Sequence, residues 1–173
     1  SNADPKRTFK TMFQAEELDE DTLKRMDSWK TTAGCVKFLA AMNELPDLTG
    51  YLGASYDANS IINIKIMPSV DYHKQSWRDA ANGKVSSCPV MNIQIPSTVE
   101  PNLVKGKGHV MSNWVLFEPP TLKDSTWEAE REKVGEQIID VISQYAPNFR
   151  TSLVDWTVQT PEDIESRVGM TDG

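Results

Sequence analysis

The chain has 173 residues, of which 39% are hydrophobic and 25% are charged, a composition typical of one globular domain rather than of a disordered segment. The 18 Lys and Arg against 25 Asp and Glu give a net charge of −7, which argues against binding to nucleic acid phosphates. Two cysteines, Cys35 and Cys88, are too few for a disulfide framework. We therefore expect a cytoplasmic, reducing compartment, and the composition leaves association with a membrane surface open.

Five segments of the sequence predict β-strands. The pattern is clearest where Ile62, Ile64 and Ile66 alternate with Asn63 and Lys65, because successive side chains of a strand point to opposite faces. Proline or glycine bounds several of the segments, as is typical of turns. The expected strands are 35–42, 61–67, 90–95, 109–117 and 153–158.

Capping signals predict the helices between these strands. Ser69 is the expected N-cap of a helix to about residue 82, with Val70, His73, Trp77 and Ala80/Ala81 on its inward stripe. The longest helix is expected to open at the capping box Ser125-x-x-Glu128. Acidic residues at 19–21 and the pair Thr160-Pro161 mark two shorter helices. Together these elements predict an α+β fold with a mixed, largely antiparallel sheet covered by helices.

Most chemical signatures are absent from the sequence. It contains no G-x-G-x-x-G, P-loop, H-E-x-x-H or C-x-x-C pattern. His73 and His109, together with the two cysteines, show no spacing typical of metal ligands, so no metal site is predicted. The isolated motifs therefore give no function.

The order of the segments is more informative than any single motif. Six stretches follow one another as in a known family: SNADPKRTF at 1–9, CVKFLA at 35–40 with ELP at 44–46, PSVDY at 68–72, PVMNIQIPS at 89–97, GKGHVMS at 106–112 and TPEDIESRVG at 160–169. Together they resemble the phytoene dehydrogenase-like FAD-dependent oxidoreductases, in the branch with a pyridine nucleotide-disulphide oxidoreductase domain. The chain departs from the family pattern at 105–108, where the family has a proline before Gly-Lys-His, and at the final 171–173.

The resemblance implies that the chain is one part of a longer enzyme. In that family an N-terminal Rossmann unit binds FAD and a C-terminal segment completes the flavin site, and this chain matches neither. The expectation is therefore a single substrate-binding domain over 1–173, inactive alone, with FAD held by the full-length protein and none on this fragment. The expected cofactor-proximal residues lie at the two junctions with the FAD domain: Asp4, Pro5, Arg167 and Gly169. Ser1-Asn2-Ala3 fits both this family and the remnant of a cleaved tag.

The resemblance also implies oxidation of an apolar or amine-like small molecule. The sheet would form the floor of a tunnel that faces the flavin. The candidate lining residues are Phe38, Ile64, Ile93, Trp114 and Phe117, and core packing under the helices is the alternative for each of them. The expected partners are the FAD domain of the same protein and, through the surface that this domain would cover, a second copy of the chain. No catalytic residue is assigned.

A second function is compatible with the same sequence. The chain could be a free-standing ligand-binding or protein-interaction module without flavin chemistry. Flavin content and the length of the native gene product distinguish the two.

Overall fold

A computed structural model describes residues 3–30 and 33–173. Ser1 and Asn2, which belong to the first stretch of the family resemblance and to the tag alternative, lie outside these ranges. The described chain contains one antiparallel sheet in the order β2-β3-β4-β1-β5. This arrangement confirms the predicted α+β class. The strands are β1 Gly34–Met42, β2 Asn63–Ile66, β3 Val90–Gln94, β4 His109–Glu118 and β5 Leu153–Gln159.

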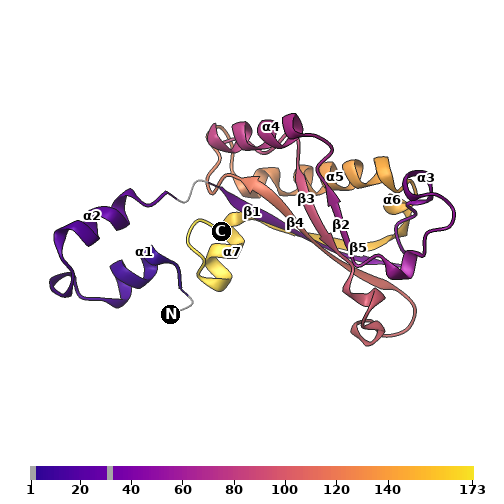
Figure 1. The fold of residues 1–173 in the computed structure, drawn as a ribbon, viewed down its shortest axis with the longest axis horizontal. Helices are drawn as coiled ribbons and strands as arrows, with labels where there is room; N and C mark the ends of the chain where they lie inside the picture. The colour runs from indigo at the N-terminus through magenta and orange to yellow at the C-terminus, as the bar shows by residue number, and fades with distance from the viewer. Residues whose placement is uncertain (1–2, 31–32) are drawn as a thin grey trace.

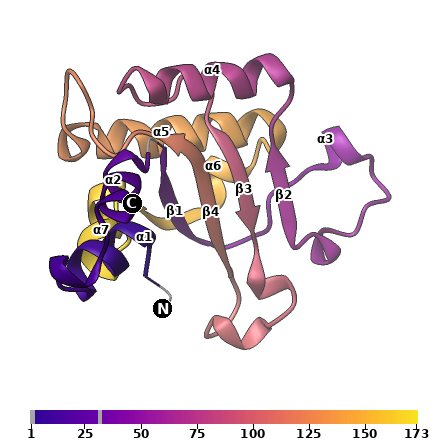
Figure 2. The same ribbon diagram turned by 60° about the vertical axis from the view of Figure 1, so that its left-hand side comes forward.

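Two long helices, α4 Val70–Ala81 and α5 Trp127–Tyr145, lie on the same side of the sheet (Figures 1 and 2). Every second residue of β1 is buried on this side, and so are the inward residues of β3 and β4. The core between sheet and helices includes Val36, Phe38, Met91, Ile93, Met111, Val115, Trp127, Val134, Ile138 and Ile142. The apolar spacing predicted for the longest helix therefore serves to pack α5 on the sheet.

Shorter elements complete the described chain. Two one-turn helices, α3 Thr49–Leu52 and α6 Phe149–Ser152, follow β1 and α5. The helix α7 Pro161–Val168 ends the chain after β5, with Gly169 in the left-handed region at φ 69°. The remaining short turns are 3-10 helices at Ala58–Ser60, Pro96–Thr98 and Pro101–Leu103. None of the described helices is long and apolar enough to cross a membrane.

The capping predictions are mostly confirmed. The hydroxyl of Ser69 accepts a hydrogen bond from the Tyr72 amide, and Thr160 forms a capping box with Asp163. The box expected at Ser125 is wrong by one residue, because Thr126 is the N-cap of α5 and accepts from the Ala129 amide. Since both residues are hydroxyl donors and acceptors, composition alone could not choose between them.

The inward stripe predicted for α4 is wrong in part. Ala80 of the predicted stripe is buried, as is Ser76, which the prediction left out, whereas Val70 and Trp77 are 70% and 45% exposed. The helix is therefore turned so that small residues approach the sheet. Trp77 instead contacts Phe117 edge-to-face at the rim of the helix.

One residue of the core is polar without a described partner. Asn113 in β4 is fully buried, and it lies opposite Phe38 of β1 and Ile93 of β3. Within the described part of the chain, neither its amide nitrogen nor its amide oxygen forms a hydrogen bond. A buried amide in this state destabilises the fold.

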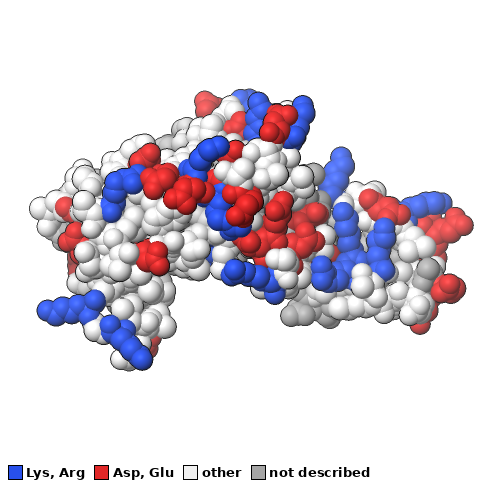
Figure 3. Space-filling model, turned by 180° about the vertical axis from the view of Figure 1, so that it is seen from behind, with Lys and Arg blue, Asp and Glu red and all other residues white. Residues whose placement is uncertain are grey.

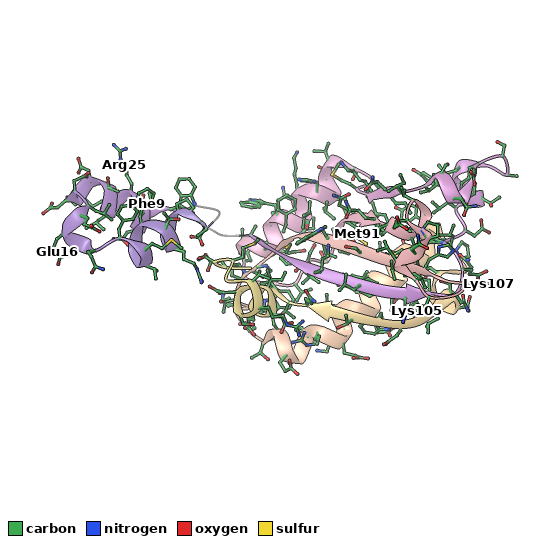
Figure 4. The ribbon with its side chains drawn as sticks, turned by 90° about the horizontal axis from the view of Figure 1, so that it is seen from below. Phe9, Glu16, Arg25, Met91, Lys105 and Lys107 are labelled. Carbon is green, nitrogen blue, oxygen red and sulfur yellow. The ribbon has the colours of Figure 1, made fainter. Side chains whose placement is uncertain are left out.

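The N-terminal segment 3–30 has the shape of a separate arm (Figures 1 and 4). It contains α1 Pro5–Arg7, a π-helical turn at Thr8–Met12, a 3-10 turn at Ala15–Glu17 and α2 Glu20–Ser28. None of its described side chains is buried, although it includes apolar residues such as Met12 and Phe13. Figure 4 shows Phe9, Glu16 and Arg25 on this arm, and Lys105 and Lys107 at the opposite end of the molecule.

Acidic side chains gather on the middle of one side of the molecule (Figure 3). Ion pairs offset part of this charge where α5 meets α7. The guanidinium of Arg131 pairs with Glu128 and with Asp163 at 3.0 and 2.5 Å, and it donates to the Val158 carbonyl at 2.8 Å. Arg131, on α5, thus links α5 to α7 through Asp163 and to β5 through the Val158 carbonyl.

Candidate functional site

The side of the sheet away from α4 and α5 is the candidate site, and we call it the open face. Because Val36, Phe38, Ala40 and Met42 are buried under the helices, the residues between them point to the open face. The β1 residues on this face are Cys35, Lys37, Leu39 and Ala41. Strand register places Leu116, Trp114, Ser112 and Val110 of β4 beside them in the same order.

The middle of the open face is apolar. Antiparallel sheets that cover a core on one side commonly present polar residues to water on the other. Apart from the buried Val90 at the start of β3, the outer strands follow this rule with Asn63, Lys65, Asn92, Gln94, Asp155, Thr157 and Gln159. The two strands in between present instead what we call the central stripe: Cys35, Leu39, Ala41, Val110, Trp114 and Leu116. A stripe of this kind is typical of a surface that another body or ligand covers.

One end of the central stripe is hollowed. A cavity of ≈ 390 Å³ is lined by Leu39 and Ala41 of β1, Val110 and Ser112 of β4, and Asp155 and Thr157 of β5. Pro96, in the connection after β3, also lines it. Its volume falls in the range of small-molecule sites, and its walls are mainly apolar.

Lys37 is the cation nearest to the middle of the stripe. Its ammonium lies 3.8 Å from the centroid of the Trp114 ring, a cation–π contact. Partial burial lowers the pKa of Lys37. Burial also raises the pKa of the Cys35 thiol, which lies on the same face, so this cysteine is a neutral side chain rather than a nucleophile.

The five predicted lining residues lie in different parts of the structure, and not on one face. Phe38 and Ile93 are fully buried in the core under the helices, the alternative given for them above. Ile64 is half-buried and lines a second cavity of ≈ 320 Å³, together with Tyr51 and Tyr145. Trp114 lies on the open face. Phe117 has a positive φ of 61° at the end of β4 and contacts His73 and Trp77 on the helix side.

The residues that sequence reasoning missed are Lys37, Leu39, Ala41, Val110 and Thr157. A shift of one residue along a strand moves a side chain to the other face. In β1 both sets of alternate positions are largely apolar, so the sequence does not distinguish the core face from the open face. The signal that was available is the unbroken apolar run itself, which is typical of a strand covered on both sides.

The predicted junction residues are brought together. The Asp4 carboxylate accepts a hydrogen bond from the Thr171 hydroxyl at 2.6 Å and another from the Arg7 amide at 2.9 Å. A Cβ built on Gly169 would lie 2.8 Å from the Arg7 guanidinium, so the arm approaches the end of α7 closely. Pro5 opens α1, and Arg167 is exposed in the last turn of α7.

A buried polar cluster lies apart from the open face, between α4 and the end of β4. Glu118 is 1% exposed and accepts a hydrogen bond from the Ser86 amide at 3.2 Å. The hydroxyl of Ser86 donates to that of Ser76 at 2.9 Å. Burial raises the pKa of Glu118 to about 8, despite the opposing effect of the Ser86 amide. Across the described ranges, no group of His, Cys, Asp and Glu is arranged to hold a metal ion.

Comparison with known proteins relates this domain to a class of enzyme. The chain is 27% identical over 180 residues to the rat protein named pyridine nucleotide-disulfide oxidoreductase domain-containing protein 2, a match that covers 100% of the chain. The mouse protein of the same name is 28% identical over 172 residues, which cover 95% of the chain. The chain is an oxidoreductase-related domain. It spans only 31% and 29% of the lengths of these two relatives, and no family model matches it.

Proposed function

We propose that the chain is the substrate-binding domain of an FAD-dependent oxidoreductase of the phytoene dehydrogenase-like type, inactive on its own. The observation that carries the proposal is the central stripe on a domain related to oxidoreductases. Neither α4 nor α5 covers this stripe, and one end of it is hollow. In the proposed enzyme, the stripe is the floor of a substrate site that an FAD domain of the same protein closes.

The junction residues fit an edge contact with FAD rather than a nucleotide pocket. Both carboxylate oxygens of Asp4 already accept hydrogen bonds, and Pro5 has no amide N–H to offer. The Arg7 guanidinium already lies against Gly169, whereas the exposed guanidinium of Arg167 is suited to a phosphate. We therefore assign the edge contact to Arg167 and most of the FAD binding to a further domain.

When FAD is bound, it supplies the redox chemistry. The residues of this chain bind and orient the substrate. We propose that the substrate is an apolar or amine-like small molecule. Leu39, Ala41 and Val110 give it apolar contact, and closure over the stripe excludes water.

The size and colour of the native gene product test this function. We expect a protein much longer than 173 residues, with a flavin absorption that bleaches on reduction with dithionite. A colourless native protein of this length would overturn the proposal. The chain would then be a free-standing ligand-binding or protein-interaction module.

A further inference from the structure

Lys37 lies among the residues of the central stripe, and its charge lacks a counter-ion. Lys37 lies on β1 between Trp114 of β4 and Gln159 of β5, which face it from the two neighbouring strands. Throughout 3–30 and 33–173, no carboxylate lies within ion-pairing distance of Lys37, and no oxygen accepts a hydrogen bond from it. The contact with Trp114 uses the ring face and leaves the ammonium N–H groups available to an anion.

The surroundings of Lys37 are apolar along the strand. Cys35 and Leu39 are its neighbours on the same face, and the cavity begins at Leu39. A partly desolvated ammonium without a partner is costly, and an anion in contact with it removes part of that cost. The stripe therefore presents a single cation beside an apolar cavity.

The far end of the cavity carries the opposite charge. Asp155 faces Ala41 across the β1–β5 pairing, four residues along β1 from Lys37 or about 13 Å. An anion is disfavoured at the Asp155 end and favoured at the Lys37 end. A ligand with one acidic group therefore has one preferred orientation, with its apolar body over Leu39 and Val110.

We propose that the open face binds an apolar molecule that ends in a carboxylate, with the carboxylate on Lys37 and the apolar body in the cavity. This inference rests on the proposed function and narrows its substrate class. Gln159 is positioned opposite Lys37 and offers its amide as a second donor to the same carboxylate. A like charge at Lys37 disfavours an amine-like ligand in this orientation.

Calorimetric titration of the chain with three probes of equal chain length tests the proposal: decanoate, decanol and decylamine, each below its micelle-forming concentration. We expect decanoate to bind at least about tenfold more tightly than the other two, because only decanoate forms a charge-assisted hydrogen bond with Lys37. Lys37→Met removes this preference, and Lys37→Arg keeps it. Lys65→Met is the matched control, because Lys65 lies on the same face but on the edge strand β2 and away from the stripe.

Three results would overturn the inference. Decanol or decylamine could bind as tightly as decanoate, Lys37→Met could keep the preference, or none of the probes could bind the chain. Circular dichroism of each variant shows that the fold is retained. The flavin content of the native gene product is measured separately, so failure of the carboxylate site and failure of the proposed function are distinguishable.

Discussion

Asp4 and Thr171 stand 167 positions apart in the sequence and are joined by a hydrogen bond of 2.6 Å. The bond links the start of the arm to the segment after α7. It places the two predicted junctions side by side, at the end of the sheet where β1 begins. A second body attached through both segments would approach the sheet from that end.

Loss of the Thr171 hydroxyl should release the arm. Thr171→Val keeps the shape of the side chain and removes the hydroxyl donor to Asp4, so the contact between α1 and the C-terminal segment is weakened. We expect faster tryptic cleavage after Arg7 and Lys10, which is measured by mass spectrometry over time.

Thr151→Val provides the control for this experiment. The hydroxyl of Thr151 bonds only locally, to the Asn148 carbonyl. Equal cleavage rates in the two variants would contradict the role given to Thr171.

The stability of the chain should fall as pH rises because of Glu118. Its pKa is about 8 in the folded chain and near 4.5 in the unfolded chain, so the folded state binds the proton more tightly. The favourable contribution is complete below about pH 4.5 and is lost as the pH rises through 8. Chemical denaturation between pH 5 and 9 measures this loss. Glu118→Gln should flatten the profile over this window, whereas Glu132→Gln, at an exposed position on α5, should keep the wild-type slope.

Replacement of Asn113 should stabilise the chain. Asn113→Val removes two buried polar atoms that have no described partner and introduces a strand-forming side chain at this core position. We expect the free energy of unfolding to rise by about 1–3 kcal/mol. Asn92→Val, a half-buried position on the open face of β3, should change it little. A destabilised Asn113→Val variant would contradict this prediction.

The central stripe should make the isolated chain associate. Apolar surface exposed on one face favours contact between two copies. Sedimentation velocity at increasing concentration is expected to show species larger than a monomer. Leu39→Asn should shift the distribution toward the monomer, and Val70→Asn, on the outer side of α4, should leave it unchanged. A monomer at all concentrations would contradict this prediction.

The sequence predicted the elements better than their faces. The alternation of Ile64 and Ile66 with polar residues predicted the face of β2, because only one set of positions there is apolar, whereas Ile62 precedes the strand and is exposed. In β1 the same method placed Phe38 among the candidate lining residues, since Leu39 and Ala41 are apolar as well. The side that the helices cover is a tertiary property that one strand does not encode.

The site depended even more on long-range contacts. Lys37 is an ordinary charged residue in the sequence. It becomes a candidate binding residue because the sheet brings Trp114 and Gln159 beside it. The bond between Asp4 and Thr171 likewise has no local signature. The exposure of Trp77 likewise depends on tertiary packing, because the polar Ser76 is buried beside the predicted Ala80 and turns Trp77 outward.

The two-sided character of β1 has a consequence for the tolerance of this strand to mutation. In β2 and β3, polar substitutions should be tolerated at alternate positions in a selection for function. In β1 and β4 that alternation should disappear, because the even positions of β1 are required for folding and the odd positions for whatever the stripe contacts. If each substitution in β1 were scored only for the abundance of the folded protein, polar residues should again be tolerated at every second position. The difference between the two scores would therefore map, residue by residue, the part of the sheet that function requires beyond folding.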